Sequence, residues 1–153
     1  MTNYQLETDR IIKSLDHAPT LFLHACCAPC SSYVLEYLAE HFNITVFFYN
    51  PNITEKDEYE KRKNELKRLI REKPFRYPVK MIDGDYAPDL FFAMAKGKEH
   101  IPEGGERCFL CYEMRLRETA RLAKQFAELF GTGPDAVFLI QLCFEVCTAF
   151  VNH

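Results

Sequence analysis

The sequence lacks several features that would assign a protein to a class at once. It has 19 basic and 22 acidic residues, and the net charge of −3 gives no overall basic character of the kind that binds nucleic acid. Met1 is not followed by the basic and then apolar stretch of an export signal. The longest apolar run, residues 136–151, is interrupted by Gln141 and Glu145 and is too short to cross a bilayer comfortably. These absences predict a soluble cytoplasmic protein with no membrane attachment.

Cysteine, by contrast, is abundant, with seven in the chain. In a reducing compartment, closely spaced cysteines indicate a metal or redox site rather than a disulfide scaffold. Three lie within five positions, as Cys26, Cys27 and Cys30, and the adjacent pair cannot form an ordinary disulfide without a distorted peptide. A second pair, Cys108 and Cys111, has the C-x-x-C spacing of metal and redox sites. We therefore expect the two segments to meet in space around a metal centre.

The chemistry of thiolates narrows the choice of metal. Soft thiolate ligands select zinc, copper(I) or iron–sulfur clusters. Four ligands, from Cys26, Cys27, Cys108 and Cys111, would complete a [4Fe–4S] cluster, and in principle also a structural zinc site. Adjacent cysteines are expected to span two vertices of a single ion poorly, whereas they can ligate different irons of a cluster. The residue types therefore favour a cluster over zinc or metal-free redox thiols, and Cys30 is either a redox thiol or a ligand to a second metal.

Short β-rich runs alternate with helical patterns along the chain. Strands are predicted at 20–24, 44–49 and 78–82. Strands and helices that alternate in this way form right-handed β–α–β units, which predicts an α/β fold with a mainly parallel sheet. Ligands of such sheets bind beyond the carboxyl ends of the strands. The cysteines after the first strand and residues 49–52 after the second should therefore lie beside one crevice.

Helix boundaries are predicted from capping residues and breakers. Ser31 or Ser32 should cap the helix after the first strand. A capping box at 54–57 should open a long helix that ends at Pro74. A short helix is expected around 90–94, and a last one should run from Cys108 to about residue 130.

Several other polar residues and cysteines have ordinary explanations. A histidine at a strand end, such as His24, is more often a hydrogen-bonded group near the core than a ligand. Asn50 and Asn52 can form a turn or bind substrate, and the sequence does not separate these roles. Cys143 and Cys147 are best explained as small hydrophobic residues of an apolar tail.

Two basic strips are present despite the negative net charge. Between positions 55 and 76 there are nine basic and six acidic residues, a local charge of +3. The second strip consists of Arg115, Arg117, Arg121 and Lys124. A solvated helix face is the default interpretation of such strips. Phosphate contact is the alternative, because lysine and arginine contacts to phosphate supply most of the affinity for nucleic acid.

Four segments of the chain form one specific pattern. They are HACCAPCSSYVL at 24–35, YNPNI at 49–53, Glu58-Tyr59 with Arg62, and GGERC at 104–108 continuing through Cys111 to Arg115 and Leu116. Over about residues 15–127 this pattern closely resembles the QueH family of epoxyqueuosine reductases. The resemblance implies a three-layer, Rossmann-like α/β fold of the HUP (adenine-nucleotide α-hydrolase-like) group. It also implies reduction of epoxyqueuosine to queuosine in the anticodon loop of tRNA, the last step of queuosine biosynthesis.

The resemblance further implies roles for individual cysteines. By the family motif, a [4Fe–4S] cluster would be bound by Cys26, Cys27, Cys108 and Cys111. Cys30 lies in the same motif and is the candidate catalytic residue. Electrons would pass through the cluster, with a second iron acting as a Lewis acid on the epoxide oxygen. No cobalamin-binding signature is evident, so no cobalamin is expected, and the sequence does not identify the electron donor.

The resemblance ends after about residue 130. This divides the chain into a QueH-like cluster-binding domain at 1–130 and a divergent apolar tail at 131–153. Family members usually continue with a Cys-Gly-Cys pair resembling a redox-active disulfide, which Cys143 and Cys147 do not reproduce. Truncation or a shifted reading frame is our hypothesis for this ending, and an inactive truncated reductase is one alternative function. Another is a non-catalytic zinc-binding module that binds RNA, while a nucleotide-activating enzyme is disfavoured because no glycine-rich phosphate loop follows the first strand.

Overall fold

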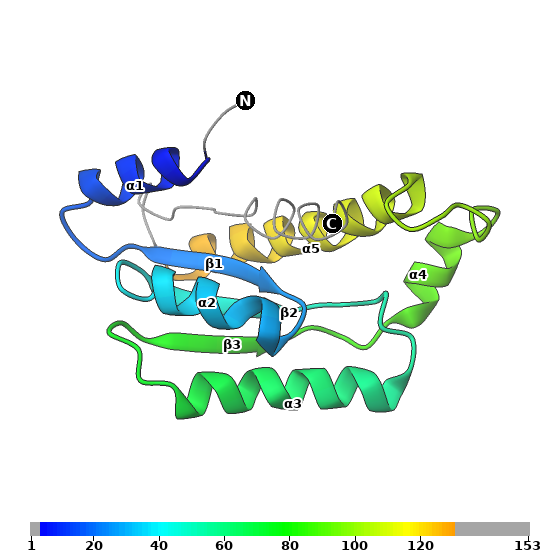
Figure 1. Ribbon diagram of the computed structural model, residues 1–153, viewed down its shortest axis with the longest axis horizontal. Helices are drawn as coiled ribbons and strands as arrows, with labels where there is room; N and C mark the ends of the chain where they lie inside the picture. The colour runs from blue at the N-terminus through cyan, green and yellow to red at the C-terminus, as the bar shows by residue number, and fades with distance from the viewer. Residues whose placement is uncertain (1–3, 131–153) are drawn as a thin grey trace.

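The computed structural model describes residues 4–130 and shows a sheet covered by helices on both faces (Figure 1). In chain order the elements are α1 (Tyr4–Ser14), β1 (Thr20–Ala25), α2 (Ala28–Leu38), β2 (Asn43–Phe48), α3 (Lys56–Glu72), β3 (Val79–Asp83), α4 (Pro88–Ala95) and α5 (Glu106–Phe130). The strands pair in parallel in the order β1-β2-β3, with Thr20 opposite Asn43 and Ile44 opposite Val79. The predicted α/β fold with a parallel sheet is confirmed, and each strand lies within one residue of its predicted bounds.

The two faces of the sheet bury different sets of strand residues, because successive side chains of a strand point to opposite sides. The face covered by α2 and α3 carries the larger core cluster, to which the strands contribute Leu21, Leu23, Ala25, Ile44, Val46 and Phe48. On the other face, Phe22, Phe47 and Tyr49 pack against Ala123 of α5. Helices on both faces explain why β1 is apolar almost throughout. The resulting three layers are visible in Figure 1.

The start of α2 differs from the sequence prediction. Neither Ser31 nor Ser32 caps this helix, because it begins at Ala28 and has Cys27 at its N-cap position. Pro29 lies in the first turn, where its fixed φ suits a helix and its missing N–H has no partner to lose. As a consequence, Cys30 belongs to the first turn of α2 rather than to a loop.

Two further helix starts are also displaced. The helix α3 begins at Lys56 after Glu55, which makes no side-chain capping hydrogen bond, so the predicted capping box at 54–57 is wrong. The helix α5 begins at Glu106, two residues before the predicted start. Cys108 and Cys111 therefore both lie within the first two turns of α5. Among residues 4–130, no helix is long and apolar enough to cross a membrane.

Gly84 follows β3 and contacts the end of β2, at the edge of the sheet where the cysteines lie. Its N–H donates a hydrogen bond to the Phe48 carbonyl at 2.8 Å, and a Cβ at this position would lie 2.9 Å from both that oxygen and the Tyr49 side chain. Gly84→Ala should therefore lower the free energy of unfolding by about 1–3 kcal/mol through overpacking, as measured by urea denaturation. Asp85→Ala, at the exposed next position, is the control. Equal stability of the two variants would contradict this view of the contact.

Candidate metal centre

Three thiols gather where β1 ends and α2 begins. Cys26 follows the last residue of β1, Cys27 has an extended backbone with φ −167°, and Cys30 lies one turn further along. All three sulfur atoms lie within 4.8 Å of one another, and the Cys26 thiol donates to Cys27 Sγ at 3.8 Å. The change from strand to helix over only two residues thus brings the sulfur atoms of all three cysteines together.

This donor set suits a thiophilic metal. Metal–sulfur bonds of about 2.3 Å in tetrahedral geometry give sulfur–sulfur separations of about 3.8 Å. The Cys26–Cys27 separation equals that value, so the expectation that adjacent cysteines would span one ion poorly is not supported here. The three thiols therefore fit a single ion as well as they fit part of a cluster.

The second cysteine pair lies at the start of α5. Gly104, with φ +84°, turns the chain so that its N–H donates to Cys108 Sγ at 3.3 Å, and Cys111 is buried. Among the described residues, the potential ligand atoms that all lie within 4.8 Å of one another belong to the first cysteine segment and do not include Cys108 or Cys111. The strands end and α5 begins at the same edge of the fold, so both segments belong to this edge (Figure 1).

A chain of hydrogen bonds connects the two cysteine segments. The fully buried Asn50 donates through Nδ2 to the Ala25 carbonyl at 3.0 Å. Its Oδ1 accepts from Arg115 Nη1 at 3.4 Å, and Arg115 Nε donates to the Cys111 carbonyl at the same distance. Asn50 is thus neither a simple turn residue nor exposed to substrate. Placing Arg115 on a solvated basic strip was wrong, because it is buried; its spacing of four from Cys111 was the signal that sequence reasoning missed.

His24 is buried beneath the same site. Its Nε2 lies 2.9 Å from the Tyr49 carbonyl, and this geometry requires a ring N–H at that nitrogen. Burial, followed by the nearby positive charge of Arg115, lowers the pKa of His24 to about 4. His24 also lies outside the group of clustered ligand atoms. The interpretation as a hydrogen-bonded core residue is therefore supported over a ligand role.

The surroundings raise the pKa of three of the thiols. The hydrogen bond with Cys26, and then burial, raise the pKa of Cys27 well above its usual range. Burial likewise raises the pKa of Cys30 and, against the field of Arg115, that of Cys111. Because a metal binds the thiolate, metal binding at these positions must release protons.

Arg62 and Asn52 also lie at this edge of the sheet, one in an ion pair and the other with a buried acceptor. Arg62 of α3 donates to Glu58 at 2.6 Å. That hydrogen bond is the main reason that the pKa of Arg62 is raised, and the nearby Cys27 and Cys26 raise it further. Asn52 Oδ1, in the loop after β2, is buried and accepts no hydrogen bond from the described residues. A buried acceptor without a donor costs about 1–3 kcal/mol. Asn52 also lies in the turn that follows β2, so its turn role is observed.

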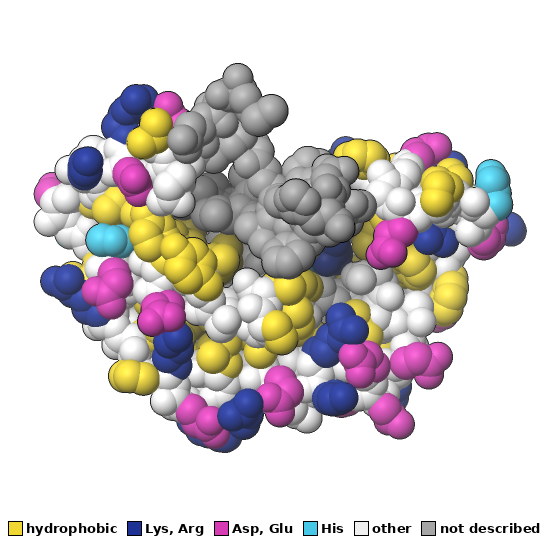
Figure 2. Space-filling model, in the orientation of Figure 1, with side chains coloured by type: hydrophobic (Ala, Val, Ile, Leu, Met, Phe, Trp, Pro, Cys, Tyr) yellow, Lys and Arg dark blue, Asp and Glu magenta, His cyan; other side chains and the backbone are white. Residues whose placement is uncertain are grey.

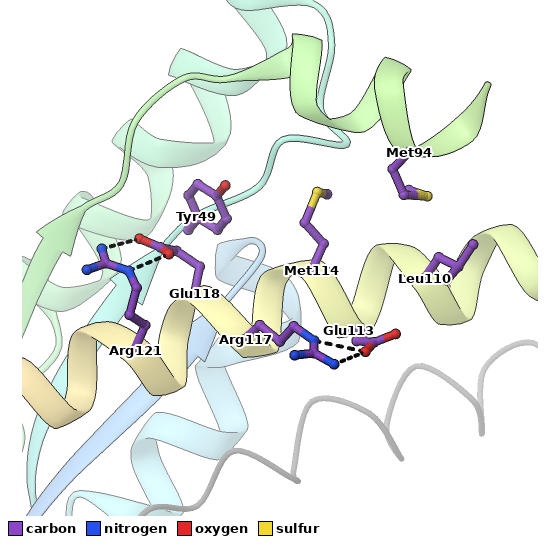
Figure 3. Close-up of a pocket in the computed structure, with 8 residues that line it drawn as sticks. All are labelled: Tyr49, Met94, Leu110, Glu113, Met114, Arg117, Glu118 and Arg121. Atoms are coloured by element: carbon purple, nitrogen blue, oxygen red, sulfur yellow. Dashed lines mark hydrogen bonds and ion pairs between the residues drawn. The ribbon is translucent and has the colours of Figure 1, made fainter.

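A groove of about 460 Å³ lies between α4, α5 and the end of β2 (Figure 3). It is lined by Tyr49, Met94, Leu110, Glu113, Met114, Arg117, Glu118 and Arg121. Tyr49 and Met114 come from facing elements, while Arg117 and Arg121 form ion pairs with Glu113 and Glu118, each at 2.6 Å. None of the five cysteines in residues 4–130 lines this groove, so it is separate from the thiol group.

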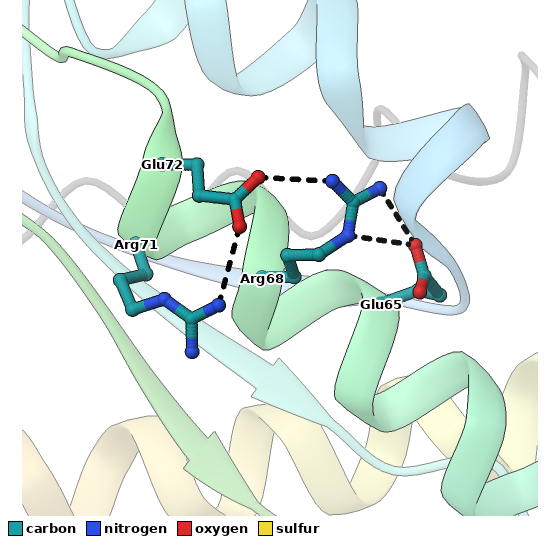
Figure 4. A network of polar contacts seen from close by, with 4 residues as sticks. All are labelled: Glu65, Arg68, Arg71 and Glu72. Atoms are coloured by element: carbon teal, nitrogen blue, oxygen red, sulfur yellow. Dashed lines mark hydrogen bonds and ion pairs between the residues drawn. The ribbon is translucent and has the colours of Figure 1, made fainter.

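Several basic side chains of α3 are paired with acidic residues of the same helix. Arg68 contacts Glu65 and Glu72, each at 2.9 Å, and Arg71 contacts Glu72 at 3.2 Å (Figure 4). Figure 2 shows basic and acidic side chains intermixed along the edge formed by α3. These contacts favour the solvated-face interpretation of the first basic strip over phosphate binding.

Comparisons with known proteins agree with the residue pattern. A family model described as "Epoxyqueuosine reductase QueH" matches residues 21–133. The curated epoxyqueuosine reductase QueH of Streptococcus pyogenes serotype M1 is 36% identical over 130 residues, which are 79% of this chain and 51% of that protein. Its counterpart in Staphylococcus epidermidis is 35% identical over 145 residues, which are 87% of this chain and 61% of the relative. In Acinetobacter baylyi the identity is 42% over 113 residues, covering 73% and 50%. The chain thus spans about half to three fifths of these relatives.

Proposed function

Because the chain belongs to the QueH family of epoxyqueuosine reductases, we propose that it reduces epoxyqueuosine to queuosine in tRNA, in the last step of queuosine biosynthesis. The observation that carries the proposal is the gathering of three thiols at the carboxyl edge of a parallel sheet, inside the matched region. The reaction removes the epoxide oxygen as water and leaves a carbon–carbon double bond. It consumes two electrons and two protons, so an external reductant must supply the electrons.

We assign the metal ligands by the family motif. Cys26, Cys27, Cys108 and Cys111 bind a [4Fe–4S] cluster, and no cobalamin is required. When bound, the cluster supplies electron-transfer chemistry. Support comes from the common edge shared by both cysteine segments and from thiols that must lose protons to bind metal.

Cys30 takes a separate role in this proposal. It is exposed and lies with its sulfur close to those of Cys26 and Cys27, where it can serve as the catalytic thiol or as a ligand to a second iron. Asn52 Oδ1 is the candidate acceptor for a substrate N–H or O–H group, because its position in the loop after β2 leaves it without a donor among residues 4–130. The tRNA that carries epoxyqueuosine is the macromolecular partner.

A structural zinc site is the second candidate function. The specific observation in its favour is the 3.8 Å separation of Cys26 and Cys27 sulfurs, which suits one tetrahedral ion. In this alternative, zinc would stabilise the fold and the chain would bind RNA without catalysis.

Metal analysis separates the two candidates. The whole chain is purified without oxygen, reconstituted with iron and sulfide, and analysed for iron, sulfide and zinc. About four irons and four sulfides per chain, with broad visible absorption, would support the cluster. Reduction of epoxyqueuosine-containing tRNA by the reconstituted chain then tests the activity. Stoichiometric zinc without sulfide would instead support the second candidate, and a chain that binds neither metal would contradict both.

A further inference from the structure

Arg115 is a buried cation that has no carboxylate partner among residues 4–130. The residue is 7% exposed, and its guanidinium donates to two neutral acceptors, the Cys111 carbonyl and Asn50 Oδ1, both at 3.4 Å. Its guanidinium also lies over the Tyr112 ring, whose centroid is 4.9 Å from the Arg115 Cζ. Within residues 4–130, arginines of α5 such as Arg117 form ion pairs with glutamates, but Arg115 forms none. Burying an uncompensated charge costs several kcal/mol, so this arrangement calls for an anion.

Arg115 lies next to a proposed metal ligand. Cys111 lies one helical turn before it, and the Cys111 carbonyl accepts a hydrogen bond from Arg115 Nε at 3.4 Å. Four thiolates around an iron–sulfur core would give the site a net negative charge, and such charge is one of the determinants of its reduction potential.

The position of Arg115 is fixed from both sides. On its own helix, Thr119 is fully buried and its Oγ1 donates to the Arg115 carbonyl at 2.7 Å. Towards the sheet, Asn50 connects the guanidinium to Ala25, the residue immediately before Cys26. One side chain therefore contacts the helix that carries Cys111 and, through a single buried amide, the strand end that carries Cys26.

We propose that Arg115 is a positioning residue of the metal centre that offsets the negative charge of the metal–thiolate group and, through Asn50, aligns the two cysteine segments. This inference rests on the proposed function, because it requires that the cysteines bind a metal. A purely structural arginine would tie α5 to the sheet without any effect of its charge on the metal. The two possibilities differ in what happens when charge is changed and shape is kept.

The experiment compares reconstituted wild-type chain with four variants. Arg115→Met removes the charge and keeps most of the volume, and Arg115→Lys keeps the charge but not the planar fork. Asn50→Asp adds the missing carboxylate beside Arg115 and neutralises it without deleting it. Arg117→Met is the matched control, because this side chain is 79% exposed and lies two residues away on the same helix.

The readouts are the rate of iron release to a chelator and the reduction potential of the bound metal. Outer partners of metal ligands typically contribute 10–100-fold in affinity, so Arg115→Met should release iron about 10–100-fold faster. Its potential should become more negative, because a nearby positive charge stabilises the reduced, more negative state. Asn50→Asp should shift the potential in the same direction, Arg115→Lys should retain most of the wild-type potential, and Arg117→Met should match wild type in both measurements.

The outcomes separate this inference from the proposed function. If the wild-type chain assembles no cluster, both are overturned. If wild type assembles the cluster but Arg115→Met and Asn50→Asp match the control in potential and iron release, only the role of Arg115 is overturned. Circular dichroism checks folding, and should Arg115→Met fail to fold, the potential of Asn50→Asp decides. That variant keeps the arginine and an oxygen that accepts from its guanidinium, and it loses the donation to the Ala25 carbonyl.

Discussion

Replacing Cys26 or Cys108 by alanine should reduce iron and sulfide from about four of each per chain to near zero after anaerobic reconstitution. Each substitution removes one of four proposed ligands, one from each cysteine segment. Cys26 follows β1 and Cys108 lies in α5, so the two cysteines are far apart in the sequence. Equal losses of iron and sulfide would therefore show that both segments bind one centre. Iron and sulfide analysis and the visible spectrum are the measurements.

Two further variants sharpen this test. Cys30→Ala should keep the full iron and sulfide content but lose tRNA reduction, because we assign Cys30 to catalysis or to a second iron. Cys143→Ala, outside the described residues and expected to be a packing residue, should keep both properties and controls for the loss of a thiol. Full iron and sulfide content in Cys108→Ala, or loss of both in Cys30→Ala, would show that the ligand assignment is wrong and that the close group of Cys26, Cys27 and Cys30 binds the metal.

The metal-free chain should lose about 3 kcal/mol of stability through His24 as the pH falls from 7 to 4. The pKa of His24 is lowered from 6.5 to about 4 in the folded chain, first by burial and then by Arg115. Between these values the unfolded chain binds a proton that the folded chain does not, so acid favours unfolding. A difference of about 2.5 pKa units at 1.36 kcal/mol each gives the magnitude, and the loss is complete below the folded pKa.

Urea denaturation of the chelator-treated chain at several pH values measures this effect. His24→Gln keeps an N–H that can donate to the Tyr49 carbonyl but does not titrate. The difference in pH dependence between wild type and this variant isolates His24 from the carboxylates. His100→Gln, at an exposed position, should retain the wild-type dependence. Parallel stability curves for wild type and His24→Gln would mean that His24 is charged in the folded chain or accessible to water.

The sequence alone determined the class of fold and the kind of chemistry. Strand positions could be predicted to within one residue because β-rich runs bounded by breakers are local signals. The kind of metal site could also be predicted from the cysteines, because a thiol is a soft ligand wherever it lies in the chain. The assignment to an epoxyqueuosine reductase family was also available from the residues, because the cysteine segments and the Asn50 loop keep a specific order and spacing.

Helix starts were less accessible to sequence reasoning because several residues compete to cap each helix. Ser31 was a reasonable capping candidate by residue type, yet Pro29 in the first turn and the end of β1 place the start of α2 four residues earlier. This shift changes the chemistry, since it moves Cys30 onto the helix and brings its sulfur close to those of Cys26 and Cys27.

Only the tertiary structure decided which polar residues serve the site. Arg115 belonged, in sequence, to a basic strip with Arg117, and both lie on α5. Folding exposes Arg117 beside Glu113 but turns Arg115 toward the sheet, where Asn50 links it to the strand that precedes Cys26. The physical reason is that the helical period places Arg115 and Arg117, two residues apart, on different faces of α5. What each face packs against depends on elements that are distant in the sequence. Residue type is a local property, but burial and the sign of neighbouring charges are not.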